Sequence, residues 1–184
     1  CYVFRFDGKN WIFEDFLISE DLDGDTKPDI AGFANGWGQA VKIAGDSIAI
    51  GARLYNIPGT PPLFNAGVVV TFRFDNGMWI EDERLVPPEQ NEADAFGQSL
   101  DFEQTAIVAG APGADDAADG AGEIHIFVRS VVDGWQWQQV YRPEGLQAGD
   151  RYGAAVAVDN TLLVASASRD DDQGNQSGAL YLSQ

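Results

Sequence analysis

One motif recurs three times along this sequence, and the repetition limits the possible fold more than any other feature. An aromatic residue followed by glycine stands at Trp37-Gly38, Phe96-Gly97 and Tyr152-Gly153, with spacings of 59 residues (37 to 96) and 56 residues (96 to 152). A period of this size is typical of repeat architectures, in which each unit buries its apolar face against the next. We therefore expect a row of similar units.

Further blocks follow each copy of the motif in the same order. One is a short apolar run, the next is a glycine followed by a β-branched or aromatic run, and a last block carries tryptophan after a turn, as at Trp79 and Trp135. The first two blocks lie at 49–52, 108–112 and 164–167, and at 67–72, 122–127 and 178–182. Such runs, bounded by Gly, Asp and Asn, are typical of strands. Four strands per repeat predict an all-β chain, a β-propeller of four-stranded antiparallel blades, with a β-sandwich as the alternative.

The same alignment assigns both ends of the chain to incomplete blades, because residues 2–7 match residues 70–75 at the third strand of a repeat. We expect one partial propeller domain over 1–184, with about three blades' worth of strands. Its expected parts are the second half of a blade with a linker (1–36), two blades (37–95 and 96–151) and the first three strands of another (152–184). A closed ring needs about four to eight blades. The chain is thus expected to be a fragment, with further blades of the same protein as its partners.

The middle repeat carries the motif in its fullest form. Phe96-Gly97, then Gly110-Ala111-Pro112, then Gly122 before a strand that ends in Phe127, resembles the FG-GAP repeat of integrin alpha-type β-propellers, in the form found in bacterial-style surface and secreted proteins. The resemblance implies a secreted or cell-surface module for binding or cell adhesion, with a protein or carbohydrate ligand on a loop face. It leaves one alternative, a propeller or accessory domain of a secreted hydrolase or lyase whose catalytic residues lie outside this segment.

The physical interpretation of the motif is structural. Glycine beside a large aromatic lets two strands approach closely while the ring fills the space between blades. Asp94 and Asp150 each lie two residues before the aromatic, and Asn35 takes that place in the first repeat. We expect these side chains to bond local backbone amides in the turn between blades.

The most specific chemical pattern is the run Asp21-Leu22-Asp23-Gly24-Asp25-Thr26-Lys27-Pro28-Asp29. Four alternating carboxylates and one carbonyl can surround a hard cation that prefers about six to eight oxygen ligands. The spacing resembles the calcium loops of FG-GAP and related propeller repeats, which implies Ca²⁺ bound by the side chains of Asp21, Asp23, Asp25 and Asp29 and by the Lys27 carbonyl. Gly32 stands where an EF-hand would place its glutamate, so the loop is not an EF-hand. A solvated acidic turn is the alternative.

The charge of the chain limits the classes of partner that it is expected to bind. The sequence has 29 acidic residues against 11 Lys and Arg, a formal charge of −18, which disfavours nucleic acid because phosphate backbones are bound mainly by Lys and Arg. No apolar run approaches the ~20 residues of a membrane span. Two looser acidic clusters, Asp115/Asp116/Asp119 and Asp170/Asp171/Asp172, lack the alternating spacing of a cation loop, and we expect exposed turn residues there.

No residue pattern predicts an enzyme. The only histidine, His125, aligns with Tyr2, Val70 and Tyr181 in the other repeats, so it occupies an ordinary strand position. The only cysteine, Cys1, aligns with apolar core residues and is expected to pack as one. We therefore expect no catalytic residue and no organic cofactor in this segment.

Overall fold

The computed structural model describes residues 1–19, 35–103, 105–159 and 161–183. These residues form an all-β structure without a helix, in one two-stranded, two four-stranded and one three-stranded antiparallel sheet. The strands are β1 (Tyr2–Phe6), β2 (Trp11–Phe16), β3 (Trp37–Ala44), β4 (Ser47–Ala52), β5 (Val68–Asp75), β6 (Met78–Leu85), β7 (Ser99–Glu103), β8 (Ala106–Ala111), β9 (Glu123–Ser130), β10 (Gly134–Tyr141), β11 (Tyr152–Asp159), β12 (Leu162–Ala167) and β13 (Ala179–Ser183). The predicted all-β fold is confirmed.

Each complete sheet is a meander in which consecutive strands pair, in the orders β3-β4-β5-β6 and β10-β9-β8-β7. The second strand of each, β4 and β8, is buried at every residue but the first. It is covered on both faces by neighbouring sheets, which explains its continuous run of small and apolar residues. The β5–β6 turn at Asn76-Gly77 has φ of 50° and 88°, as type I′ hairpin turns require.

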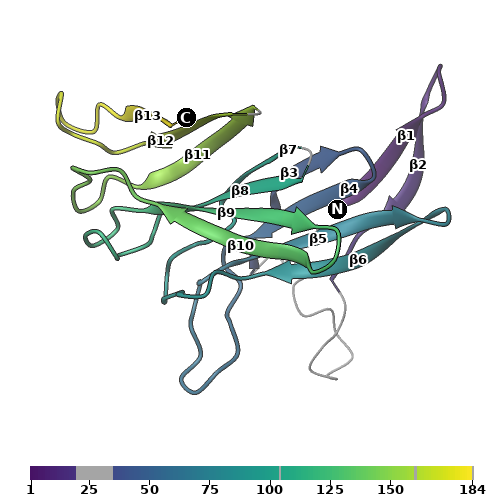
Figure 1. Cartoon of the computed structure of the whole chain (residues 1–184), viewed down its shortest axis with the longest axis horizontal. Coiled ribbons are helices and arrows are strands. Elements are labelled where there is room, and N and C mark those ends of the chain that lie inside the picture. The colour runs from purple at the N-terminus through teal and green to yellow at the C-terminus, as the bar shows by residue number, and fades with distance from the viewer. Residues whose placement is uncertain (20–34, 104, 160, 184) are drawn as a thin grey trace.

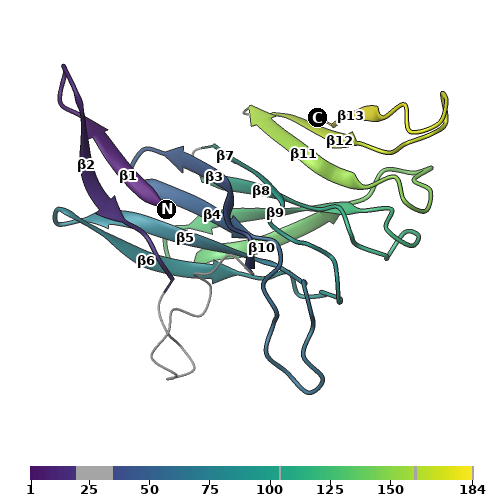
Figure 2. The ribbon, with the colours of Figure 1, turned by 180° about the vertical axis from the view of Figure 1, so that it is seen from behind.

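The sheets stand in a row, as Figures 1 and 2 show from opposite sides, with the β1–β2 hairpin at one end and the β11–β13 sheet at the other. The hydrophobic core lies between neighbouring sheets and not inside any one of them. The cluster between the two four-stranded sheets joins Val69 and Leu85 to Leu100, Ile107 and Phe127. Face-to-face packing of successive four-stranded units is the arrangement of propeller blades.

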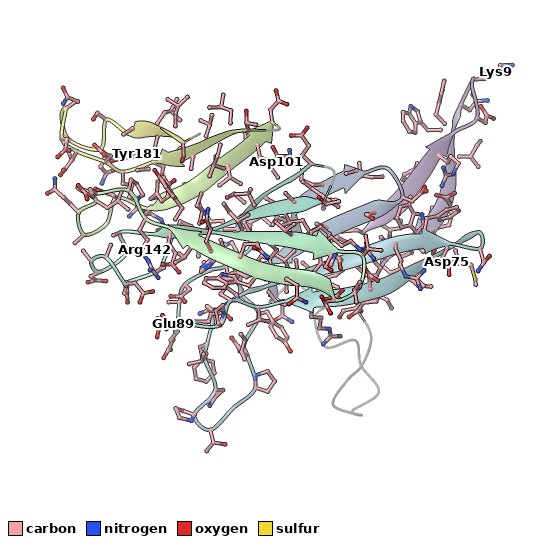
Figure 3. All side chains as sticks on the ribbon, viewed as in Figure 1. Lys9, Asp75, Glu89, Asp101, Arg142 and Tyr181 are labelled. Atoms are coloured by element: carbon pink, nitrogen blue, oxygen red, sulfur yellow. The ribbon has the colours of Figure 1, made fainter. Side chains whose placement is uncertain are left out.

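The two ends of the strands differ. At one end the strands are joined by tight turns, such as those that carry Lys9 and Asp75 in Figure 3. At the other end lie the long connections 53–67, 112–122 and 168–178, and Figure 3 shows Glu89 and Arg142 toward that side. None of the described residues belongs to a helix that is long and apolar enough to cross a bilayer.

Candidate functional site at the blade junctions

Two junctions between sheets are built alike, and each centres on an aromatic-glycine pair. Phe96 pairs with Gly67 of the preceding sheet, and Tyr152 pairs with Gly122, in both cases as a parallel bridge. The backbone N–H of each aromatic residue donates to the carbonyl of the residue before that glycine, Phe96 to Ala66 at 2.9 Å and Tyr152 to Ala121 at 2.8 Å. The two rings are 0% and 1% exposed. The aromatic residue therefore fills the space between two blades while its backbone joins them.

The glycine after each ring brings backbone against backbone. A Cβ atom on Gly97 would lie 3.0 Å from the Val68 carbonyl oxygen, and one on Gly153 would lie 2.5 Å from the Glu123 carbonyl oxygen. Both glycines also have positive φ, 79° and 84°, which residues with a side chain rarely adopt. The predicted close approach of strands at this motif is confirmed.

The carboxylates that precede the aromatics hold the turn between blades, as the sequence predicted. Asp94 accepts a hydrogen bond from the Asn91 amide, and Asp150 accepts one from the Gln147 amide, both at 2.6 Å. Both carboxylates are buried. In each case the donor is the backbone amide of an exposed residue three positions earlier, so the bond closes the turn.

Asp94 differs from an ordinary turn residue because other acids surround it. Burial raises its pKa to about 6, and the charges of Glu123, Asp116 and Asp115 add to that rise, although the bond from the Asn91 amide opposes it. Its Oδ1 atom is buried and has no hydrogen-bond partner among the described residues. Ionised Asp94 is thus held in an unfavourable place at neutral pH.

Replacing Asp94 with asparagine should stabilise the protein at pH 7.5 and not at pH 4. An acid whose pKa is higher in the folded state than in the unfolded state contributes most stability below its unfolded pKa, near 3.8, and loses it as the pH rises through about 6. Asparagine keeps an acceptor for the Asn91 amide and carries no charge. The first repeat already has asparagine at the equivalent position, Asn35. The expected gain at pH 7.5 is about 1–2 kcal/mol, measured by urea unfolding.

Asp101→Asn is the control, since it should have the opposite sign at pH 7.5. Burial acts to raise the pKa of Asp101, but the amide of Val158, then Lys42 and the amide of Phe102, lower it overall. The Val158 N–H lies 2.7 Å away and Lys42 Nζ lies 3.1 Å away, so this carboxylate joins three successive sheets. Equal effects of the two substitutions, or a gain for Asp94→Asn that persists at pH 4, would contradict the assignment.

A second polar cluster lies on β9 beside the Asp94 turn. Glu123 is 1% exposed and His125 is 3% exposed. Glu123 Oε1 lies 2.8 Å from His125 Nε2, and its Oε2 accepts from Arg142 Nε at 2.5 Å. Arg142 also reaches Asp116 in the β8–β9 connection, at 3.2 Å, and Trp137 Nε1 donates to His125 Nδ1 at 3.3 Å. Arg142 thereby links the buried Glu123 carboxylate to the β8–β9 connection.

This cluster was not predicted, although one signal was available. Glu123 and His125 are two residues apart on a strand, so their side chains share a face, and the corresponding residues of the first repeat, Val68 and Val70, are apolar. Burial acts to raise the pKa of Glu123, but His125 and Arg142 together lower it overall. Arg142 forms an ion pair with Glu123 Oε2, whereas Oε1, beside His125, makes no well-oriented hydrogen bond among the described residues. Pairing of a buried carboxylate with a guanidinium group is typical of a structural network.

The acidic loop clusters are only partly the exposed residues that the sequence predicted. Asp115 and Asp171 are exposed, and Asp115 accepts a hydrogen bond from the Gly120 amide at 2.7 Å. Asp170 corrects the prediction, because it is 4% exposed and accepts from the Tyr181 hydroxyl at 3.0 Å. It aligns with Ala114 of the preceding repeat. The equivalent residues His125 and Tyr181 on the third strands of the two repeats therefore each contact a carboxylate, that of Glu123 in one repeat and that of Asp170 in the other.

A hollow of about 610 Å³ opens between the connections 112–122, 142–151 and 168–178. Its charged lining has both signs, with Asp115 and Asp119 from the β8–β9 connection, Arg151 from the next turn and Arg169 from the β12–β13 connection. This chemistry suits a polar ligand that both donates and accepts hydrogen bonds.

The predicted calcium ligands, Asp21, Asp23, Asp25, Lys27 and Asp29, lie outside the described residues. Within the described part of the chain, no group of three or more His, Cys, Asp or Glu side chains is arranged to hold a metal ion. The calcium assignment therefore stays a prediction from the spacing of the sequence. Cys1 is partly buried and packs against the cluster that contains Leu17.

A comparison with family models finds the FG-GAP repeat twice, over residues 79–127 and 135–183. Each match begins on the fourth strand of one sheet and ends on the third strand of the next, so the conserved unit of the family spans a blade junction. The protein is thus a propeller-type module, and the chain belongs to the FG-GAP repeat family. No curated protein matches the chain.

Proposed function

We propose that this module acts outside the cell, secreted or at the cell surface, and binds a protein or carbohydrate ligand at the end where its long connections gather. The observation that carries the proposal is the asymmetry of the two ends. One end has tight turns, and the other has the long connections and the mixed-charge hollow. Function is commonly placed on loops that a rigid scaffold positions. We assign the segment no catalysis.

A binding screen tests the proposal. The purified chain would be applied to a glycan array and to immobilised extracellular matrix proteins, with detection through a fused tag. We expect a ligand whose signal falls at least about tenfold in the variant Asp119→Ala with Arg169→Ala, which strips two charged groups from the hollow. Glu144→Ala, an exposed substitution in the β10–β11 connection, is the control. Binding that ignores the hollow, or no binding to either set, would contradict the proposal.

We propose further that calcium supports the module through the loop 21–29. Binding of an ion to the folded state alone stabilises it, by about 2.7 kcal/mol when the ion is at 100 times its Kd. For a chain of this size the expected rise in Tm is roughly 5–10 °C. Differential scanning fluorimetry with and without Ca²⁺ measures it.

The calcium test needs matched variants. Asp23→Ala with Asp25→Ala should abolish the rise, because it removes two of the predicted oxygen ligands. Asp115→Ala with Asp119→Ala removes the same charge from another loop and should leave the rise unchanged. A parent protein that shows no response to Ca²⁺, or a response equal in both variants, would overturn the calcium assignment without affecting the binding proposal.

A further inference from the structure

Two arginine residues line the hollow between the connections 112–122, 142–151 and 168–178, and we call them the arginine pair. They are Arg151 and Arg169, and no ion pair or side-chain hydrogen bond joins either guanidinium group to a described residue. The other described arginines all bind a carboxylate or an amide oxygen of another side chain: Arg5, Arg53, Arg73, Arg84, Arg129 and Arg142. In a chain with 29 acidic residues, two unpaired arginines at one place require an explanation.

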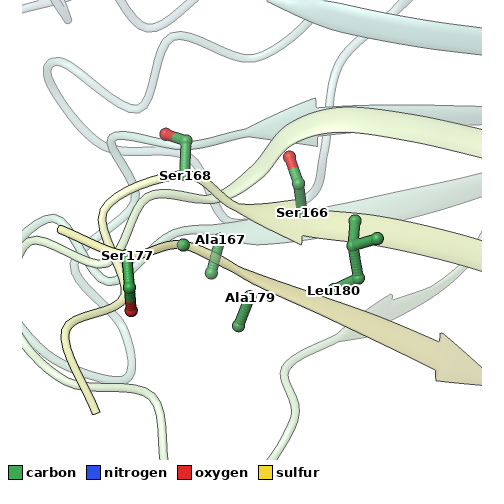
Figure 4. Close-up of a pocket in the computed structure, with 7 residues that line it drawn as sticks. Ser166, Ala167, Ser168, Ser177, Ala179 and Leu180 are labelled. Atoms are coloured by element: carbon green, nitrogen blue, oxygen red, sulfur yellow. The ribbon is translucent and has the colours of Figure 1, made fainter. Parts of the chain in front are cut away.

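The backbone places the two arginines next to one another. The Arg169 N–H donates to the backbone carbonyl of Asp150 at 3.0 Å, and Asp150 directly precedes Arg151 in the chain. At the far end of the connection that carries Arg169, which Figure 4 shows, the Ser177 hydroxyl donates to the Asp170 carbonyl at 3.3 Å. Hydrogen bonds therefore hold the backbone from which both side chains start, so the fold sets the position of the pair.

The pair is absent from the preceding repeat, although the same backbone turn exists there. Ala95 and Gly113 occupy the two positions in that repeat. The Gly113 N–H makes the equivalent bond, to the Asp94 carbonyl at 3.0 Å, and φ is 57° at Ala95 and 58° at Arg151. The turn thus forms with neither guanidinium group, so the pair is not needed to build a blade junction.

The two carboxylates nearest to the arginines in sequence already have other partners. Asp150 Oδ2 accepts from the Gln147 amide at 2.6 Å, and Asp170 Oδ2 accepts from the Tyr181 hydroxyl at 3.0 Å. Both side chains are buried, each 4% exposed. The N–H donors of the arginine pair consequently remain available to an anion from outside, and guanidinium groups bind carboxylates through two parallel hydrogen bonds.

The rest of the hollow offers acceptors and little apolar surface. Asp119 lines it, and its carboxylate also has no side-chain or amide partner in the described part of the chain. The uncharged lining consists of alanine, proline and glycine residues. Anchors of protein partners are commonly aromatic side chains in apolar pockets, for which this lining is unsuited. The ligand that fits it carries an anionic group together with several hydroxyl donors.

We propose that this hollow binds the acidic sugars of a polysaccharide, with the carboxylate of a uronic-acid unit on the arginine pair and a sugar hydroxyl donating to Asp119. The inference rests on the proposed function, because it names the ligand class for the same hollow. An acidic protein segment would also satisfy the guanidinium groups, but it has fewer hydroxyl donors for Asp119. A sugar acid supplies both kinds of group on one ring.

Isothermal titration calorimetry with defined trimers tests the ligand class. The probes are trigalacturonate, trimannuronate, the methyl ester of trigalacturonate, and triglutamate. We expect at least one of the two uronate trimers to bind, and the ester, which keeps the ring hydroxyls but lacks the charge, to bind at least about tenfold more weakly than trigalacturonate. Failure of both uronates to bind, equal binding of the ester, or tighter binding of triglutamate would overturn the inference.

Variants locate the site and separate binding from folding. Arg151→Ala and Arg169→Ala should each weaken uronate binding at least about tenfold. Arg151→Ala should leave the Tm within about 2 °C of the parent, because alanine stands at the equivalent position of the preceding repeat. Lys9→Ala is the control, since it removes a cation from the tight-turn end (Figure 3) and should change neither quantity.

Two further outcomes distinguish this inference from the proposed function. A neutral ligand from the binding screen that depends on Asp119 and Arg169 would overturn the inference and leave the proposed function intact. Uronate binding that survives both arginine substitutions would place the sugar elsewhere and overturn the inference as well. A fall in the Tm of Arg151→Ala by more than about 5 °C would instead assign that arginine a structural role.

Discussion

Replacing Gly97 with valine should destabilise the protein by about 3 kcal/mol or more. Even the Cβ atom would lie 3.0 Å from the Val68 carbonyl oxygen and 3.0 Å from Val69 Cγ2. The φ of 79° adds strain for a β-branched residue. Since the clash falls on the backbone of the preceding sheet, the two blades would have to separate and expose the apolar cluster between them. Urea unfolding followed by tryptophan fluorescence measures the loss.

Gly77→Ala separates strain from packing in this prediction. Gly77 also has positive φ, 88°, but a Cβ atom there would meet nothing within 4 Å. Its expected cost is about 1 kcal/mol, from the backbone alone. Gly110→Ala gives the converse case, because Gly110 lacks positive φ while its Cβ would strike the Gly153 carbonyl oxygen. If all three variants were equally stable, the close approach at the junctions would not be what selects glycine.

Replacing Glu123 with alanine should cost about 2–4 kcal/mol at pH 7. The substitution removes the carboxylate that pairs with both His125 and Arg142, and it leaves a cavity beneath the blade junction. The loss is at the lower part of the range for a buried pair, because Arg142 is partly exposed and keeps Asp116 as a partner. Glu144→Ala, on the exposed β10–β11 connection, should change the free energy of unfolding by less than about 0.5 kcal/mol.

The pH dependence of this effect has a definite sign. The pKa of Glu123 is lower in the folded state than its ordinary value of 4.5. Its contribution to stability is therefore present above pH 4.5 and is lost as the pH falls through the lowered pKa. The difference between the parent and Glu123→Gln, which keeps the shape and one acceptor, should shrink as the pH falls below 4.5. A difference that stays constant from pH 7 to pH 3 would show that the charge does not contribute.

The two acids at this junction thus respond to pH in opposite directions. Asp94 is buried next to other carboxylates and loses stability on ionising, while Glu123 is buried next to His125 and the Arg142 guanidinium group and gains stability on ionising. Burial is similar for both, 2% and 1% exposed. The sign is decided by the neighbours that the fold places around each carboxylate.

The repeat made the fold predictable. Three aromatic-glycine pairs at near-constant spacing, with the strand-like blocks that follow them in the same order, predicted strands, sheets and the interface between them, because each repeat has to bury the same face against the next one. The same reasoning predicted that Asp94 and Asp150 would bond the turn, since an acid at a fixed distance before a buried aromatic lies next to unpaired amides. Repeat position also showed that His125 replaces an ordinary strand residue.

What repeat position could not show is which differences between repeats compensate for one another. Glu123 lies on β9 and Asp170 in the β12–β13 connection, yet each carboxylate lies against the same position of the third strand, His125 in one sheet and Tyr181 in the next. The hydroxyls of Ser99 and Ser166 likewise lie on different strands of their sheets, one bonded to the Gly153 carbonyl and the other to the Ala155 amide. These exchanges are contacts across strands and sheets, so no local pattern contains them.

The sequence by itself determined the strands, the register of the repeat and the family, because periodic burial leaves its pattern in the order of apolar residues and glycines. The tertiary structure alone decided the state of the polar groups at the junctions. Whether a carboxylate such as Asp94 resists ionisation, or one such as Glu123 is stabilised by it, depends on charges a few ångströms away in space and far away along the chain.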